Sequence, residues 1–315
     1  MSRDSVVAQP LVKRPPSRLA AGWSMAISSV FCSSVATPVA RAAILNGFNP
    51  NAMLMARMVL AMTILSLAML LFSREHLRAD WSAVMLAFLA GILNGIGTTL
   101  YFWGIARLDA SMAAMIVSTS PLAVLSLLAL RGERLTYRHA LRMALALAGL
   151  YLLIGPGGAV DPVGVLFVVC AVFAFSVQLV LLQWYLVAYS ARTIIFYQIL
   201  GMTVVALFWW LLQGAVWEDP GAQGWISVIV LAVFSTFGAR LLMFEAVVRI
   251  GGGQVSMLAP VETLLAVIWS ILFLNETLAP IQWLGGVLIL LSAMLAVRRI
   301  NLRRRRPRWR ISARL

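Results

Sequence analysis

The 315-residue chain is 62% hydrophobic and 11% charged, and its formal net charge is +14. Soluble domains carry about 25% charged residues, so this composition excludes a fold whose whole surface faces water. The arginines sit in short segments beside apolar runs, which disfavours nucleic-acid binding and favours a membrane protein with basic cytoplasmic loops. Cys32 and Cys170 both fall inside apolar runs, so we expect no disulfide framework, metal site or bound cofactor.

Apolar runs of about 20 residues can cross a bilayer as helices, and this chain contains ten candidate spans. In chain order they are Leu19–Ala40, Asn51–Phe72, Trp81–Ala106, Ala110–Leu130, Ala140–Ile154, Pro162–Tyr185, Thr193–Gln213, Gly224–Val248, Gln254–Leu274 and Ile281–Val297. The first span follows a basic lead-in, residues 1–18, and is similar to a cleavable signal peptide. We expect it to be retained, because the second half contains an equivalent helix, Pro162–Tyr185.

The two halves of the chain match at a nearly constant spacing. The matched pairs are Gly22 with Gly164 and Arg107 with Arg249, both 142 residues apart, Glu133 with Glu276 at 143, and Arg57 with Gln198 at 141. A constant spacing indicates an internal duplication. We therefore predict one repeat at residues 19–155 and a second at 156–297, followed by an arginine-rich tail at 298–315.

The distribution of positive charge predicts the orientation in the membrane. With the amino terminus in the cytoplasm, ten spans place 21 of the 25 Lys and Arg residues in cytoplasmic segments and leave Arg41 and Arg107 outside. This bias follows the positive-inside rule, so both termini are predicted to be cytoplasmic. Because each repeat has an odd number of spans, the second is inverted relative to the first, as in many secondary transporters.

Three motifs carry a resemblance to a known family. They are GILNGIGTTLYFWGIARLDAS at 91–111, LRGERLT at 130–136 and LNETLAPIQWLGGVLI at 274–289. In order and spacing they resemble the EamA family of the drug/metabolite transporter superfamily over about residues 20–297. The resemblance implies an all-α membrane protein with ten helices around a central cavity, which moves small metabolites and often exports amino acids.

Charged residues within spans are costly and mark functional sites by default. Arg240 and Glu262 lie at similar depths in neighbouring predicted spans. One hypothesis is that Arg240 receives a substrate carboxylate while Glu262 receives an amine or a coupling proton. The other is a fixed ion pair that joins the two helices. Arg57 lies near the outer end of its span, where we expect its side chain to snorkel to the interface.

Other candidate residues follow from polarity, aromaticity or helix interruption. Cavity-lining candidates are Asn94, Gln178, Trp103 and Phe244. Candidate hinges or gates are Pro38, Pro121, Pro260 and Glu245, because a proline inside a helix permits bending. Glu133 and Glu276 are expected to be structural, capping the helices that follow them.

The sequence therefore predicts a monomeric secondary transporter in the inner membrane of a bacterial cell. The leading prediction is export of amino acids or related zwitterions by alternating access, with possible coupling to protons or a counter-substrate. Export of other metabolites or drugs, such as purines or cationic compounds, is the alternative. A membrane enzyme acting on lipid-linked substrates is disfavoured, because the chain has no cluster of acidic residues at a membrane face.

Overall fold

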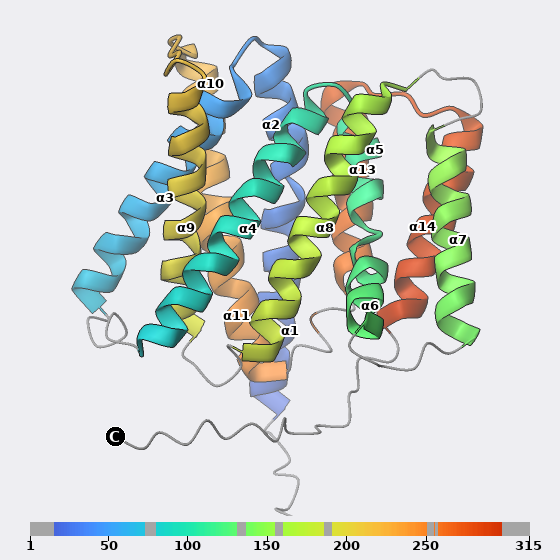
Figure 1. Cartoon of the computed structure of the whole chain (residues 1–315), viewed down its shortest axis with the longest axis horizontal. Coiled ribbons are helices and arrows are strands. Elements are labelled where there is room, and N and C mark those ends of the chain that lie inside the picture. Colours follow the sequence, from blue (N-terminus) through green and yellow to red (C-terminus); the bar gives the residue numbers. More distant parts are fainter. Residues whose placement is uncertain are drawn as a thin grey trace, which may run out of the picture.

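The computed structural model describes residues 16–72, 80–130, 137–154, 160–185, 191–250, 255 and 258–297. These residues form helices joined by short turns, without a β-strand among them, and the helices run roughly side by side between two ends of the molecule (Figure 1). Helices are expected here, because a backbone in lipid must satisfy its own hydrogen bonds. The predicted lead-in up to residue 15, the linker at 155–158 and the tail at 298–315 lie outside the described residues.

Most of the described helices begin and end within a few residues of the predicted positions. Their bounds are α1 Pro16–Ser34, α2 Ala36–Leu45, α3 Pro50–Phe72, α4 Trp81–Ile105, α5 Ala110–Val117, α6 Ser120–Leu130, α7 Tyr137–Ile154, α8 Pro162–Tyr185, α9 Ala191–Leu212, α10 Gly221–Ile229, η2 Val230–Gly238, α11 Ala239–Ile250, α13 Ala259–Leu274 and α14 Pro280–Val297. The largest differences are at α2, which continues to Leu45 where the prediction ended at Ala40, and at α13, which begins at Ala259 where the prediction began at Gln254.

Six of the described helical segments are long and apolar enough to cross a membrane. They are Leu19–Leu45, Pro50–Leu71, Trp81–Ile105, Pro162–Leu182, Arg192–Leu212 and Gly221–Val247. Four shorter apolar helices fall at the other predicted spans: Ala110–Val124, Met143–Leu153, Ala259–Leu274 and Pro280–Ser292. Large apolar side chains such as Ile27, Leu71 and Phe273 are 58%, 63% and 70% exposed, as expected for helices that face lipid.

Two of the predicted hinge prolines lie just after breaks between helices. The first predicted span divides into α1 and α2 at Val35, three residues before Pro38. The fourth divides into α5 and α6 just before Pro121. Proline has no N–H to donate to the carbonyl four residues earlier, which for Pro121 is that of Val117. The Ser120 hydroxyl donates to this carbonyl at 2.5 Å and so replaces the missing hydrogen bond.

Pro260 occupies a different position from the one predicted. It lies in the first turn of α13, which begins at Ala259, and therefore does not interrupt a described helix. Proline suits the first turn, because the N–H groups there have no partner within the helix. The predicted hinge at Pro260 is therefore corrected to a helix start.

The contacts between helices repeat when the two halves are exchanged. Helix α4 packs against α8 and α9 in the way that the equivalent segments of the second half, α11 and η2, pack against α1 and α3. Likewise α5 and α6 pack against α8, while α13 packs against α1 and α2. Three further contacts join equivalent helices to each other: α3 with α9, α5 with α13, and α7 with α14. This pattern is expected for two copies related by an approximate twofold axis.

Candidate functional site

Arg240 lies on α11 and its guanidinium points toward α9. Its Nη1 donates to Oε1 of Gln198 at 3.2 Å, and its Nη2 lies 3.9 Å from the sulfur of Met202. Gln198 is 1% exposed. Its Nε2 has no hydrogen-bond partner among the described residues. Sequence reasoning did not single out Gln198 as a site residue, although it is the repeat partner of Arg57.

Arg240 and Glu262 do not form the contact that their depths predicted. Glu262 lies in the first turn of α13 and hydrogen-bonds with Ser33 of α1. Arg240 contacts α9 instead, and α1 packs against both α11 and α13. The hypothesis of a fixed ion pair between Arg240 and Glu262 is therefore wrong for this structure. The depth of a residue along its helix does not determine the direction in which its side chain points.

Arg57 also departs from its predicted arrangement. Its Nε donates to Oγ1 of Thr236 at 2.9 Å, and its guanidinium lies 5.9 Å from the centre of the Phe102 ring. Thr236 belongs to η2, so this side chain is directed at a neighbouring helix in the bundle. The predicted snorkelling of Arg57 is corrected to contacts within the protein.

Asn94 and Gln178 contact each other. Asn94 Nδ2 donates to Oε1 of Gln178 at 3.1 Å, between α4 and α8, and both side chains are buried. The hydroxyl of Thr98 donates to the Asn94 carbonyl at 2.8 Å. Both amides were predicted to line a cavity. The structure shows them bonded to each other, which also stabilises the packing of α4 on α8.

Trp103 joins α4 to two neighbouring helices. Its Nε1 donates to Oδ1 of Asn51 at 3.0 Å, and Asn51 Nδ2 donates to Oε1 of Gln213 at 2.5 Å. The centre of the Trp103 ring lies 5.3 Å from that of Trp209. Neither amide was predicted, because each lies at a helix end where sequence alone indicates a turn. Phe244, the other aromatic candidate, lies in α11, and its side chain is outside the described set.

Glu245 pairs with Arg249 one turn later on α11. Arg249 Nη1 also lies 3.0 Å from the sulfur of Met25 on α1. Glu245 thus lies at the predicted cytoplasmic end of α11, next to the contact with α1. This position is compatible with the gating role that remains a prediction for it.

Glu276 caps a helix other than the one expected. Its carboxylate accepts hydrogen bonds from Ala110 N at 2.7 Å, Ser111 N at 3.0 Å and the Ser111 hydroxyl at 2.6 Å. These groups begin α5, in the first repeat, whereas the sequence predicted the helix that follows Glu276. The carboxylate therefore connects the repeats. Glu133, its predicted counterpart, lies outside the described residues.

Two aspartates near helix starts have shifted pKa values. The Arg107 side chain donates to Asp161 at 3.0 Å and holds the pKa of that carboxyl below its usual value. Burial raises the pKa of Asp109, and the negative charge of Glu276 raises it further, while Arg41 acts in the opposite direction. Both aspartates lie at the predicted outer ends of helices.

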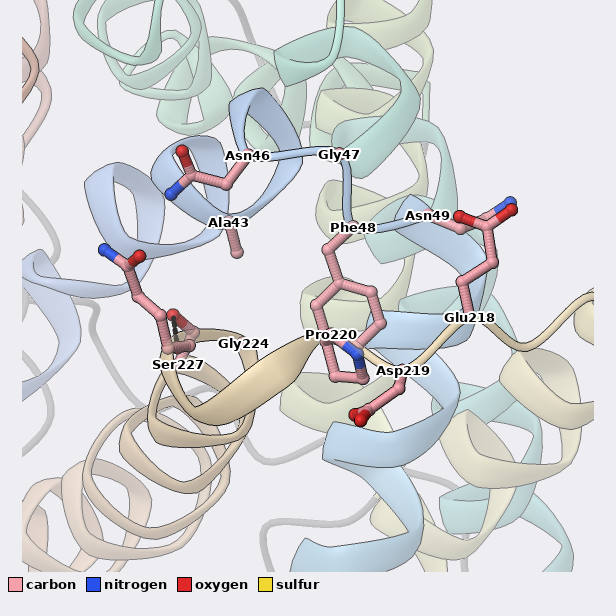
Figure 2. A pocket seen from close by; sticks show the side chains of 11 residues that line it. Ala43, Asn46, Gly47, Phe48, Asn49, Glu218, Asp219, Pro220, Gly224 and Ser227 are labelled. Atoms are coloured by element: carbon pink, nitrogen blue, oxygen red, sulfur yellow. Dashed lines mark hydrogen bonds between the residues drawn. The ribbon is translucent and has the colours of Figure 1, made fainter.

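A pocket of about 400 Å³ opens between the turn after α2 and the segment leading into α10 (Figure 2). Its polar lining includes Asn46, Asn49, Glu218, Asp219 and Gln223. Carboxylates and amide oxygens attract cations rather than anions. None of the predicted substrate residues lines this pocket.

The repeat spacing is a signal that could have identified further polar positions. At 142 residues, Arg240 corresponds to Thr98, and Thr236 corresponds to Asn94. Each pair places polar side chains at equivalent points of α4 and of the η2–α11 segment. Polarity at both members of a repeat pair therefore indicates residues that the packing brings to the interior.

Comparisons with known proteins agree with the duplicated membrane fold. The model of the EamA-like transporter family matches residues 20–155 and again residues 162–298. An uncharacterized transporter of Archaeoglobus fulgidus is 28% identical over 208 residues, covering 66% of this chain and 74% of the relative. A crystal structure of another protein has a TM-score of 0.60 at 19% identity and covers 89% of this chain and 97% of that one. At this identity the last comparison shows the fold alone.

Proposed function

The chain belongs to the EamA-like transporter family, and from this we propose that it is a secondary transporter of small organic solutes in a bacterial inner membrane. We propose ten spans in two inverted repeats, with both termini in the cytoplasm. The six long spans, the four shorter apolar helices and the exchange pattern of helix contacts support this arrangement. Inverted repeats commonly enclose a site near the middle of the bilayer and expose it to each side in turn.

The transported solute is proposed to be an amino acid or a related zwitterion, moved outward by alternating access. The observation that carries this proposal is the separation of Arg240 from Glu262. Each charge lies within a membrane helix, and each contacts a neutral polar partner instead of the other. Charges held in this way remain available to the carboxylate and the amine of one solute. A fixed pair would already be neutralised.

Counterflow in proteoliposomes tests this function. Vesicles containing the purified protein and loaded with an unlabelled amino acid are expected to accumulate the labelled form. The set of amino acids to test comes from a growth screen against toxic analogues. Arg240→Ala and Glu262→Gln are each expected to reduce counterflow at least about tenfold, because a charge-assisted contact contributes about 1.5–3 kcal/mol. Arg107→Gln, which changes an arginine at the predicted outer face, is the matched control.

Normal counterflow in both variants would contradict the assignment of these residues. Loss in Glu262→Gln alone would favour the second candidate, export of a cationic compound. The acidic pocket between α2 and α10 gives that candidate specific support.

A chain ending at Val297 is expected to keep transport. A protein that instead acts as an assembly partner through its arginine-rich tail would lose its function on this truncation.

A further inference from the structure

Two arginines lie close together in the membrane-spanning region without an acidic partner. The Arg57 guanidinium contacts Ser235 and Thr236, and Arg240 follows Thr236 by one helical turn, so the two positive charges lie near each other. Among the described residues, the ion pairs are Arg41–Asp109, Arg107–Asp161 and Arg249–Glu245. Removing a cation from water costs several kcal/mol unless an opposite charge or hydrogen bonds replace the water. A second cation alongside it adds to this cost.

The Arg57 side chain extends toward the interior of the bundle. Phe48 and Gly224 lie at the same level, since a Cβ on Gly224 would be 3.4 Å from the Phe48 ring. Arg57 comes nine residues after Phe48, whereas Thr236, which binds its Nε, comes twelve residues after Gly224. The guanidinium is therefore directed away from the end of the molecule at which α3 begins.

A π-helix brings these groups together. Segment η2 is π-helical, and the Thr236 hydroxyl donates to the carbonyl of Leu231, five residues earlier, at 2.9 Å. Such segments are rare and frequently occur at functional sites. Ser235 and Thr236 both contact the Arg57 guanidinium. Arg240 follows Thr236 by four residues, and residues at this spacing lie on one helix face.

Gln198 supplies an unused donor at the same place. Its Oε1 is occupied by Arg240, and its buried Nε2 has no hydrogen-bond partner in the described structure. An unsatisfied buried donor is costly, so Gln198 Nε2 is a candidate donor to a ligand that binds beside Arg240. By surface area, both arginine side chains are of intermediate exposure.

We propose that Arg57, Arg240 and Gln198 form an oxyanion site that binds a carboxylate of the transported solute. A guanidinium binds a carboxylate through paired hydrogen bonds, and the Gln198 amide adds another donor. The carboxylate would neutralise the repulsion between the arginines. This inference rests on the proposed transport function, and it adds Arg57 and Gln198 to the residues that select the solute.

Thermal unfolding of the purified protein in detergent, with sodium malonate as the probe, tests the site without transport. At matched ionic strength against sodium chloride, malonate is expected to raise the Tm of the unmodified protein with saturation. Arg57→Gln and Arg240→Gln are each expected to weaken the apparent Kd for malonate at least tenfold, about 1.4 kcal/mol. Arg107→Gln is the control, because any general effect of the salt on the protein is the same in this variant.

The stability of the variants without malonate separates a binding site from a structural contact. Arg57→Gln is expected to have a Tm equal to or above that of the unmodified protein, because it removes one of two repelling charges and keeps a donor for Thr236. A lower Tm in chloride would indicate a structural role and overturn the proposal.

Three further results would also overturn it: no saturable effect of malonate, the same malonate affinity in all three variants, or stabilisation by sodium phosphate but not by malonate. The experiments can reject the oxyanion site and the proposed transport function independently of each other. Normal counterflow without malonate binding removes the oxyanion site but leaves transport intact. Malonate binding that depends on Arg57, without counterflow of any solute, removes the transport function but leaves the site.

Discussion

A Cβ atom placed on Gly22 would lie 3.0 Å from the Cβ of Arg249. The same relationship occurs in the other half, where a Cβ on Gly164 would lie 3.0 Å from the Cβ of Arg107. These four residues are the pairs that match at a spacing of 142 in the sequence. Each glycine therefore allows the first helix of one repeat to approach the third helix of the other.

The close approach predicts that Gly22→Ala destabilises the protein. The new methyl group would lie 2.4 Å from Cγ2 of Ile250, so either the Ile250 side chain or the packing of α1 on α11 has to shift. Overpacking of this kind costs about 1–3 kcal/mol, and it is expected to lower the Tm in detergent. Gly164→Ala is expected to behave in the same way. Ser28→Ala, on the exposed face of α1, is the control, and an equal Tm for Gly22→Ala and this control would contradict the prediction.

Removing the charge of Glu276 is expected to destabilise the start of α5. Glu276→Gln loses a carboxylate that accepts three hydrogen bonds at a helix N-terminus, and a cap of this type contributes about 0.5–2 kcal/mol. The free energy of unfolding in detergent measures the loss. In a double-mutant cycle, Ser111→Ala should cost less in the Glu276→Gln background than in the unmodified protein. Additive effects would show that the contact contributes little.

Asp109 and Asp161 are expected to affect stability with opposite signs. Because the pKa of Asp109 is raised, its contribution to the stability of the folded protein is present at low pH and is lost as the pH rises through that pKa. Asp109→Asn should therefore raise the Tm at neutral pH, and the difference should shrink as the pH falls. The lowered pKa of Asp161 means that its contribution is present at neutral pH and is lost as the pH falls through that pKa.

Asp161→Asn should accordingly lower the Tm at neutral pH. Both variants can be compared by unfolding the protein in detergent between neutral and mildly acidic pH. The same direction of change in the two variants at neutral pH would be inconsistent with the arrangement of Arg107, Arg41 and Glu276 around them.

The hydrogen bonds of Trp103 predict that Asn51→Ala destabilises the protein. The substitution leaves the indole N–H of Trp103 and the amide of Gln213 without the partner that they share. Gln213 is exposed and can bond to water, whereas Trp103 is partly buried. An unsatisfied buried donor costs about 1–3 kcal/mol, so the loss at Trp103 is expected to be at or below the lower end of this range. The Tm should fall and the emission of Trp103 should change. Asn46→Ala, at an exposed position near the end of α2, is the matched control. A Tm at the control value would mean that water replaces the Asn51 side chain.

The sequence alone was sufficient to predict membrane helices, an internal duplication and the family. Apolar runs determine helices in lipid because the backbone there has no other hydrogen-bond partners. The repeat could be recognised from single residues such as Gly22 and Arg107. When a contact between two helices is duplicated, the residue types on both sides of it recur in the second half. The breaks near Pro38 and Pro121 follow from a missing N–H, which is also a local property.

Tertiary structure decided which polar groups meet. Arg240 contacts Gln198 rather than Glu262, Arg57 reaches Thr236, and Glu276 caps a helix 166 residues away. These outcomes depend on the rotation of each helix about its own axis, on the π-helical segment and on the neighbours that packing provides. Spacing along one chain gives the depth of a residue in the membrane, but it does not give the direction of its side chain, because that direction is set by helices distant in the sequence.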